Sequence, residues 1–254
     1  MFFYCLLFLY MVAIEPIKGK KDYLQFKREV TENPSYRISY YRKIIFSSWT
    51  LVILLLIGMW FEETAFSDIG LNAIRLKSNS FHAPVNSVFI GVLIGVIVAL
   101  FLPVILSKYS KKYQDSLFSQ LNGIEELLPS TNKERWWWMV VSLTAGITEE
   151  ILYRGFLYYS FHRIFPGASI WSIVCLSAVI FGLAHAYQGI KGMALAVYLG
   201  AILGLIYIEF DSLLPAMFIH VLFDLRLIAL LPGGRRREKE NGFEPYIVQK
   251  KRVD

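Results

Sequence analysis

The stretch TAGITEEILYRGF, residues 144–156, decides how the chain is interpreted, because it places three charged side chains in an otherwise apolar segment. They are Glu149, Glu150 and Arg154. On an insertion scale, one charged residue at the centre of a membrane-spanning helix costs roughly 2.5 to 3.5 kcal/mol. Three charges so close together therefore need partners inside the protein or a function that retains them.

The composition of the chain indicates a membrane setting for this stretch. Of the 254 residues, 56% are hydrophobic and 18% are charged, and the mean hydropathy is +0.47. These values, with several long apolar runs, are typical of a multispanning membrane protein and exclude a soluble domain. The net charge of +6 comes from basic residues in flanks and loops, as in chains whose charges orient membrane helices. No nucleic-acid recognition module accompanies them, so nucleic acid is not an expected partner.

The apolar runs predict an all-α, polytopic membrane helix bundle of about six transmembrane helices, with a glutamate and histidine site in its interior. The predicted spans are residues 44–61, 88–106, 136–161, 170–186, 193–210 and 213–231. Lysine and arginine are dense before the first span, between the second and third, and in the C-terminal tail. This bias predicts that both termini are cytoplasmic. We expect an integral, multi-pass membrane protein, in the plasma membrane if the organism is prokaryotic.

The chain divides into four predicted regions. They are an N-terminal apolar segment with a basic cytoplasmic arm (1–43), two spans with connecting loops (44–135), a four-helix core (136–232) and a basic cytoplasmic tail (233–254). The first fourteen residues are too few to span comfortably, so we expect an interfacial segment there. Met11 is an alternative first residue that would remove most of this apolar run.

Two of the three charges in the opening stretch can satisfy each other. Glu150 and Arg154 are four positions apart with the acid nearer the N-terminus, the favourable order for an ion pair on one helix face. Glu149 lies about 100° around the helix from Glu150 and has no obvious local counterion. The environment of Glu149 therefore matters most.

Two later apolar segments carry polar residues at the same helical spacing. FGLAH places Phe181 and His185 on one face, and HVLFD does the same for His220 and Asp224. Each feature alone is often structural, because a single intramembrane histidine can simply be a hydrogen-bonding residue. Together with Glu149, however, these ionisable groups are costly in lipid, and mutual contact in the bundle interior reduces that cost. We expect them to cluster.

Such a cluster of carboxylates and imidazoles can activate water, stabilise an oxyanion, bind a metal or relay protons. Spacing alone does not choose among these activities. The chain lacks the HExxH zinc signature, the GxSxG nucleophile elbow and a paired Cys-x-x-Cys. What remains is a glutamate and histidine site.

The three motifs resemble those of a known family. EEILYR is similar to EExxxR, FGLAH to FxxxH and HVLFD to HxxxN/D, the signatures of the CAAX-processing and bacteriocin-processing (CPBP or Abi) intramembrane proteases. They occur in the same order, and the resemblance covers about residues 136–232. No family motif occurs in residues 1–135.

The resemblance implies hydrolysis of a peptide bond within or beside the membrane, and it implies a role for each site residue. Glu149 would be the general base that activates water, and His185 would position that water or a metal ion. His220 and Asp224 would stabilise the tetrahedral oxyanion. The residues implied to support the site structurally are Glu150, Arg154 and Phe181. No cofactor is certain, but a divalent metal such as zinc, held by Glu149, His185 and His220, is an open alternative.

Position 224 departs from the chemistry of asparagine, which is common there in relatives. Asparagine donates a hydrogen bond to an oxyanion, whereas an ionised Asp224 can only accept one. Asp224 is therefore either protonated or used otherwise, for example to hold the tautomer of His220. A second difficulty is depth: if Trp136–Trp138 mark the interface, Glu149 lies roughly 18 Å into the bilayer, while His185 lies near the cytoplasmic end of its span.

The expected partners are the lipid bilayer and a peptide or lipidated membrane-associated protein as substrate. Whether that substrate is prenylated, and the oligomeric state, do not follow from the sequence. One alternative is a non-catalytic membrane scaffold or bacteriocin immunity protein on the same fold. A proton-coupled transporter is another, although no inverted repeat supports it.

Overall fold

The computed structural model describes residues 2–74, 83–121 and 123–231, and every regular element in these ranges is helical. The elements are α1 (Phe2–Leu9), η1 (Tyr10–Ile14), α2 (Glu15–Glu32), α3 (Tyr36–Phe61), η2 (Phe66–Ile69), α4 (Ala83–Tyr109), α5 (Lys111–Gln120), η3 (Glu125–Leu127), α6 (Asn132–Glu150), η4 (Ile151–Phe156), α7 (Leu157–Ile164), α8 (Ile170–Ala184), η5 (Ala186–Gln188), α9 (Gly189–Phe210) and α10 (Leu213–Leu230). The predicted all-α class is confirmed. The predicted basic tail, 233–254, lies outside the described residues.

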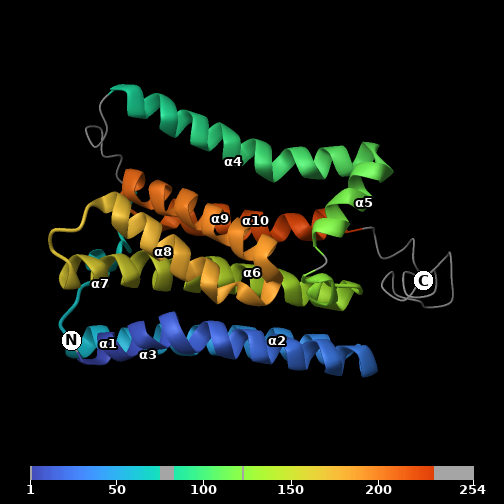
Figure 1. Ribbon diagram of the computed structural model, residues 1–254, viewed down its shortest axis with the longest axis horizontal. Helices are drawn as coiled ribbons and strands as arrows, with labels where there is room; N and C mark the ends of the chain where they lie inside the picture. The colour runs from blue at the N-terminus through green and yellow to red at the C-terminus, as the bar shows by residue number, and fades with distance from the viewer. Residues whose placement is uncertain (1, 75–82, 122, 232–254) are drawn as a thin grey trace.

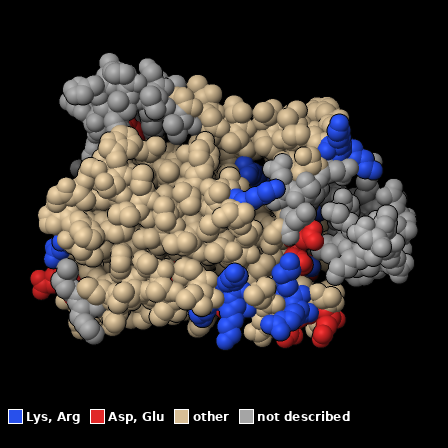
Figure 2. Space-filling model, in the orientation of Figure 1, with Lys and Arg blue, Asp and Glu red and all other residues tan. Residues whose placement is uncertain are grey.

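The long helices run roughly along one common axis (Figure 1). α1, α2 and α3 form one side of the bundle, α6 and α7 run through the middle, and α8, α9 and α10 lie on the other side, with α4 outermost. Figure 2 shows few charged side chains over most of the visible face and a concentration of them toward the end where α2 and α5 lie. The molecule is therefore a helix bundle with a long apolar surface.

Within the part of the chain that the structure describes, three helical segments are long and apolar enough to cross a membrane, namely Tyr36–Phe61, Ala186–Phe210 and Leu213–Leu230. Ile94–Tyr109 and Ile170–Ala184 are shorter apolar stretches. These helices confirm the predicted membrane helix bundle. The number of spans and the side on which the termini lie stay predictions.

The N-terminal apolar segment packs onto the bundle instead of lying apart from it. α1, η1 and α2 follow one another without a break from Phe2 to Glu32. The side chains of Tyr4, Leu7 and Met11 are buried in the main hydrophobic core. Burial of these apolar groups, at about 25 cal/mol per Å², explains why the segment is drawn into the bundle.

The start of α6 is fixed by a capping box and an ion pair. Thr131 accepts a hydrogen bond from the Glu134 backbone nitrogen, and the Glu134 carboxylate accepts one from the Thr131 nitrogen at 3.1 Å. The same carboxylate accepts from Arg37 Nη1 at 2.9 Å, and both side chains are buried. α6 is therefore anchored to α3 at its first turn.

Trp138 lies inside the protein, whereas Trp136 on the same helix is 63% exposed. Trp138 packs edge-on against Tyr41 in a second core formed largely by α2 and α3. The arm formed by these two helices covers the first turns of α6. A membrane interface at Trp136–Trp138 stays a prediction, and the helices bring Glu149 Oε2 to 3.9 Å from His185 Nε2 at the end of α8.

We predict that a larger side chain at Gly146 destabilises the bundle. α6 packs on α10 here, and a Cβ at Gly146 would collide with the Val221 side chain and lie 2.9 Å from the Val221 nitrogen. Overpacking of this kind typically costs about 1 to 3 kcal/mol. Gly146→Leu should lower the thermal unfolding temperature in detergent. Gly95→Leu in α4, where no atom lies within 4 Å of the added Cβ, is the control. Equal losses in both variants would contradict the prediction.

Candidate active site

A fully buried carboxylate, Glu150, connects the central helix to α10. Its Oε1 accepts a hydrogen bond from Arg154 Nη1 at 2.8 Å and lies 2.7 Å from His220 Nδ1. Both Glu150 and Arg154 have 0% exposure, and His220 has 3%. Because an ionised carboxylate only accepts, Nδ1 of His220 carries the proton and Nε2 faces away from Glu150. Glu150 thus orients His220 as well as pairing with Arg154.

His185 is held by its own helix. It is the C-cap of α8, and its Nδ1 lies 2.9 Å from the Phe181 carbonyl oxygen. A carbonyl cannot donate, so Nδ1 carries the proton here too. The Phe181 ring is tilted against the His185 ring, with the centroids 4.5 Å apart, and the Arg154 guanidinium lies 4.3 Å from the Phe181 centroid. Phe181 therefore supports His185 on one side and Arg154 on the other.

Glu149 lies between the two imidazoles. Its Oε2 is 3.9 Å from His185 Nε2 and 3.9 Å from His220 Nε2. The same oxygen is buried and has no hydrogen-bond partner among the described residues. Both distances exceed that of a direct hydrogen bond and match a bridge through one small molecule such as water.

Asp224 lies one turn after His220 on α10. Its Oδ2 is 4.0 Å from His220 Nε2, and its backbone oxygen accepts from Trp138 Nε1 at 3.3 Å. The alternative that Asp224 fixes the tautomer of His220 is wrong in this structure, because Glu150 already holds Nδ1. Asp224 instead faces the nitrogen that is directed toward Glu149.

A cavity of about 150 Å³ opens beside this cluster. Glu149 of α6 and His185 at the end of α8 line one side of it, and Tyr153 lies next to them. The opposite wall comes from α2 and α3. It includes Glu15, Lys18, Asp22, Lys43, Ser47 and Ser48. The N-terminal arm is therefore part of the cavity.

Glu149, His185 and His220 are the residues that the sequence predicts as ligands of a possible zinc ion. One carboxylate and two imidazoles suit zinc chemically, and zinc ligands lie about 2.0 to 2.2 Å from the metal. Among the described residues, however, no group of three or more His, Cys, Asp or Glu side chains is arranged to hold a metal ion. A divalent metal held by Glu149, His185 and His220 stays a prediction.

Sequence reasoning missed two neighbours of the site. Glu15 Oε2 accepts a hydrogen bond from Tyr153 at 2.8 Å, and both residues line the cavity. The available signal was Glu15 itself, an acid directly after a long apolar run and before Pro16. Nothing in the local pattern links it to Tyr153.

Fold and site together define a class, a membrane helix bundle whose interior gathers carboxylates and imidazoles from three helices. Residues 131–226 match the family model described as type II CAAX prenyl endopeptidase Rce1-like. The match begins at the N-cap of α6 and includes all three motifs. The resemblance to CAAX-processing proteases is confirmed for this segment, which supports a membrane protease, a hydrolase, at the level of the family.

The matched segment is less than half of the 254 residues, and α1 to α5 lie outside it. No curated protein matches the chain. No solved structure matches it either.

We predict that Arg154→Leu strongly destabilises the protein. The change leaves Glu150 buried without its cation, and breaking a buried ion pair by removing one partner costs about 3 to 5 kcal/mol. Arg163→Leu is the control, since Arg163 is exposed and its guanidinium carbon lies 5.6 Å from the centroid of the Tyr159 ring. The loss of folding stability in Arg163→Leu should stay below about 1 kcal/mol. Denaturation of both variants in the same detergent measures their stabilities. Similar losses of stability in the two variants would argue against a supporting role for Arg154.

Proposed function

We propose that the protein is an intramembrane endopeptidase that uses a glutamate-activated water. The observation that carries this proposal is the position of Glu149 Oε2, 3.9 Å from the Nε2 atoms of both His185 and His220. A water molecule between these atoms would hydrogen-bond to a base and two imidazoles at once. The cavity beside them gives a peptide room to approach.

In the first step, Glu149 takes a proton from the water while the water oxygen attacks the scissile carbonyl carbon. His185 keeps its proton on Nδ1, so the Nε2 lone pair can accept the second hydrogen of the water and fix its orientation. The base and the group that positions the water thus come from α6 and α8.

The attack places negative charge on the carbonyl oxygen. We propose that His220, in its protonated form, donates to this oxyanion from Nε2. The carboxylates of Glu149 and Glu150 lie 3.9 and 2.7 Å from its ring nitrogens, and these favour a positive charge on the ring. Asp224, whose Oδ2 lies 4.0 Å from Nε2, would donate to the oxyanion in its protonated form. The carbon–nitrogen bond then breaks, and Glu149 returns its proton to the leaving amine.

The cavity favours a peptide as substrate. Hydroxyl and charged groups from α2 and α3 line it, so it suits a polar segment of chain more than an acyl tail. A lipidated protein would present such a segment from the bilayer surface. A multi-pass location with both termini cytoplasmic, in the plasma membrane if the organism is prokaryotic, is part of this proposal.

We predict that Glu149→Gln abolishes peptide hydrolysis. An amide cannot take the proton from water, and loss of a general base lowers the rate by about 10² to 10⁴. The purified protein and a quenched fluorescent peptide library provide the assay. Glu63→Gln, at an exposed position after α3, should retain wild-type turnover. If Glu149→Gln cleaves peptides as fast as wild type, the protease proposal fails. Full function of this variant in cells would support a non-catalytic scaffold.

We predict that Asp224→Asn keeps activity within about tenfold of wild type, whereas Asp224→Leu loses about 10² to 10³ in kcat. The amide can donate to the oxyanion, and Glu150 still holds the tautomer of His220. Steady-state rates on one cleaved peptide measure both variants. A near-complete loss in a folded Asp224→Asn protein would show that the charge of Asp224 is needed.

A further inference from the structure

A hydrogen bond joins the N-terminal helix to the helix that carries Glu149. Tyr153 donates to Glu15 Oε2 at 2.8 Å, across 138 positions of sequence. Tyr153 is 2% exposed. Among the described residues, the Glu15 side chain has this one hydrogen bond. Glu15 lies outside the segment that matches the protease family.

Two unusual helical segments lie next to this hydrogen bond. η1 ends at Ile14, directly before Glu15, and η4 contains Tyr153. Both segments are π-helical, and they are the two such segments in residues 2–74, 83–121 and 123–231. π-Helical turns are rare and occur frequently at functional sites. Tyr10 of η1 and Tyr153 of η4 both line the cavity, which is an observation independent of the hydrogen bond.

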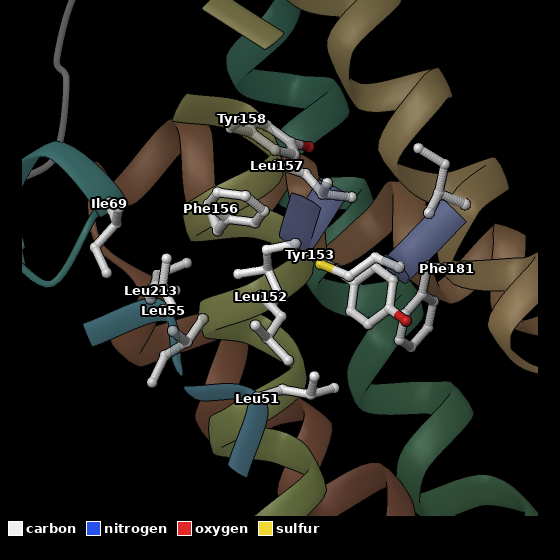
Figure 3. Close-up of a cluster of buried hydrophobic side chains, with 14 of the residues drawn as sticks. Leu51, Leu55, Ile69, Leu152, Tyr153, Phe156, Leu157, Tyr158, Phe181 and Leu213 are labelled. Carbon is white, nitrogen blue, oxygen red and sulfur yellow. The ribbon is translucent and has the colours of Figure 1, made fainter. Parts of the chain in front are cut away.

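From Tyr153, a chain of aromatic contacts leads to the proposed water-positioning histidine. The Tyr153 ring meets the Phe181 ring edge-on, with the centroids 5.0 Å apart, and Figure 3 shows the two rings side by side. The Phe181 ring lies 4.5 Å from the His185 ring, and the Phe181 carbonyl oxygen is 2.9 Å from His185 Nδ1. A shift of Tyr153 would therefore reach His185 through a single intervening residue.

We infer that Glu15 is a positioning residue of the active site, which acts through Tyr153 and Phe181 to hold His185 toward Glu149. This inference rests on the proposed function for its catalytic consequence. The geometric part, that Glu15 controls the setting of the His185 ring, can be tested without catalysis. Only the first turn of α2, at Glu15, then takes part in positioning the site.

Kinetics of four variants and one control variant test the catalytic consequence. Glu15→Leu and Tyr153→Phe should each lower kcat by about ten- to a hundredfold with KM within about twofold, because misplaced groups mainly slow the chemical step. The double variant should be no slower than either single one, since both remove the same interaction. Glu15→Gln should restore most of the activity, because its amide oxygen still accepts from Tyr153. Glu32→Leu, at the exposed end of the same helix, should match wild type.

Magnetic resonance of ¹⁵N-histidine-labelled protein tests the geometry directly. The chain has four histidines, so the ring signals of His185 can be assigned with one His185→Gln variant. Glu15→Leu and Tyr153→Phe should shift or broaden these signals, whereas Glu15→Gln and Glu32→Leu should leave them unchanged. Unchanged His185 signals in folded Glu15→Leu would overturn the inference. Absence of peptide hydrolysis by wild type would instead overturn the proposed function, and the His185 signals would still decide the role of Glu15.

Discussion

The site depends on one buried carboxylate oxygen, Glu150 Oε1, which contacts Arg154 and His220 together. A buried carboxylate without partners would cost several kcal/mol, and so would an unpaired guanidinium. The contact with His220 comes from α10, so the ion pair also joins two helices. The same contact directs Nε2 of His220 toward Glu149, at 3.9 Å from its Oε2.

The second half of the chain was largely predictable from its sequence. Apolar runs gave the helices, and the cost of charge in lipid predicted that Glu149, His185, His220 and Asp224 cluster. The structure places these groups in one cluster. Glu149 Oε2 lies 3.9 Å from Nε2 of His185 and of His220, and Asp224 Oδ2 lies 4.0 Å from Nε2 of His220. Their catalytic roles stay predictions.

Contacts between distant segments could not be predicted. Spacing of four residues suggested Asp224 as the partner of His220, but the partner is Glu150, 70 positions away. Likewise, the tryptophans in the first turns of α6 suggested a membrane interface, but one of them, Trp138, is buried against α2 and α3. In both cases the local sequence pattern agreed with the prediction. The actual contact, however, came from a helix in a distant part of the chain.

The position of the N-terminal helices has a consequence for biogenesis. Glu15 and Arg37 leave the ribosome long before Tyr153 and Glu134, the residues that satisfy them. Until those residues are synthesised, the Glu15 carboxylate and the Arg37 guanidinium lack the partners that they have in the folded protein. The cavity is therefore complete only when the later helices pack against α2 and α3.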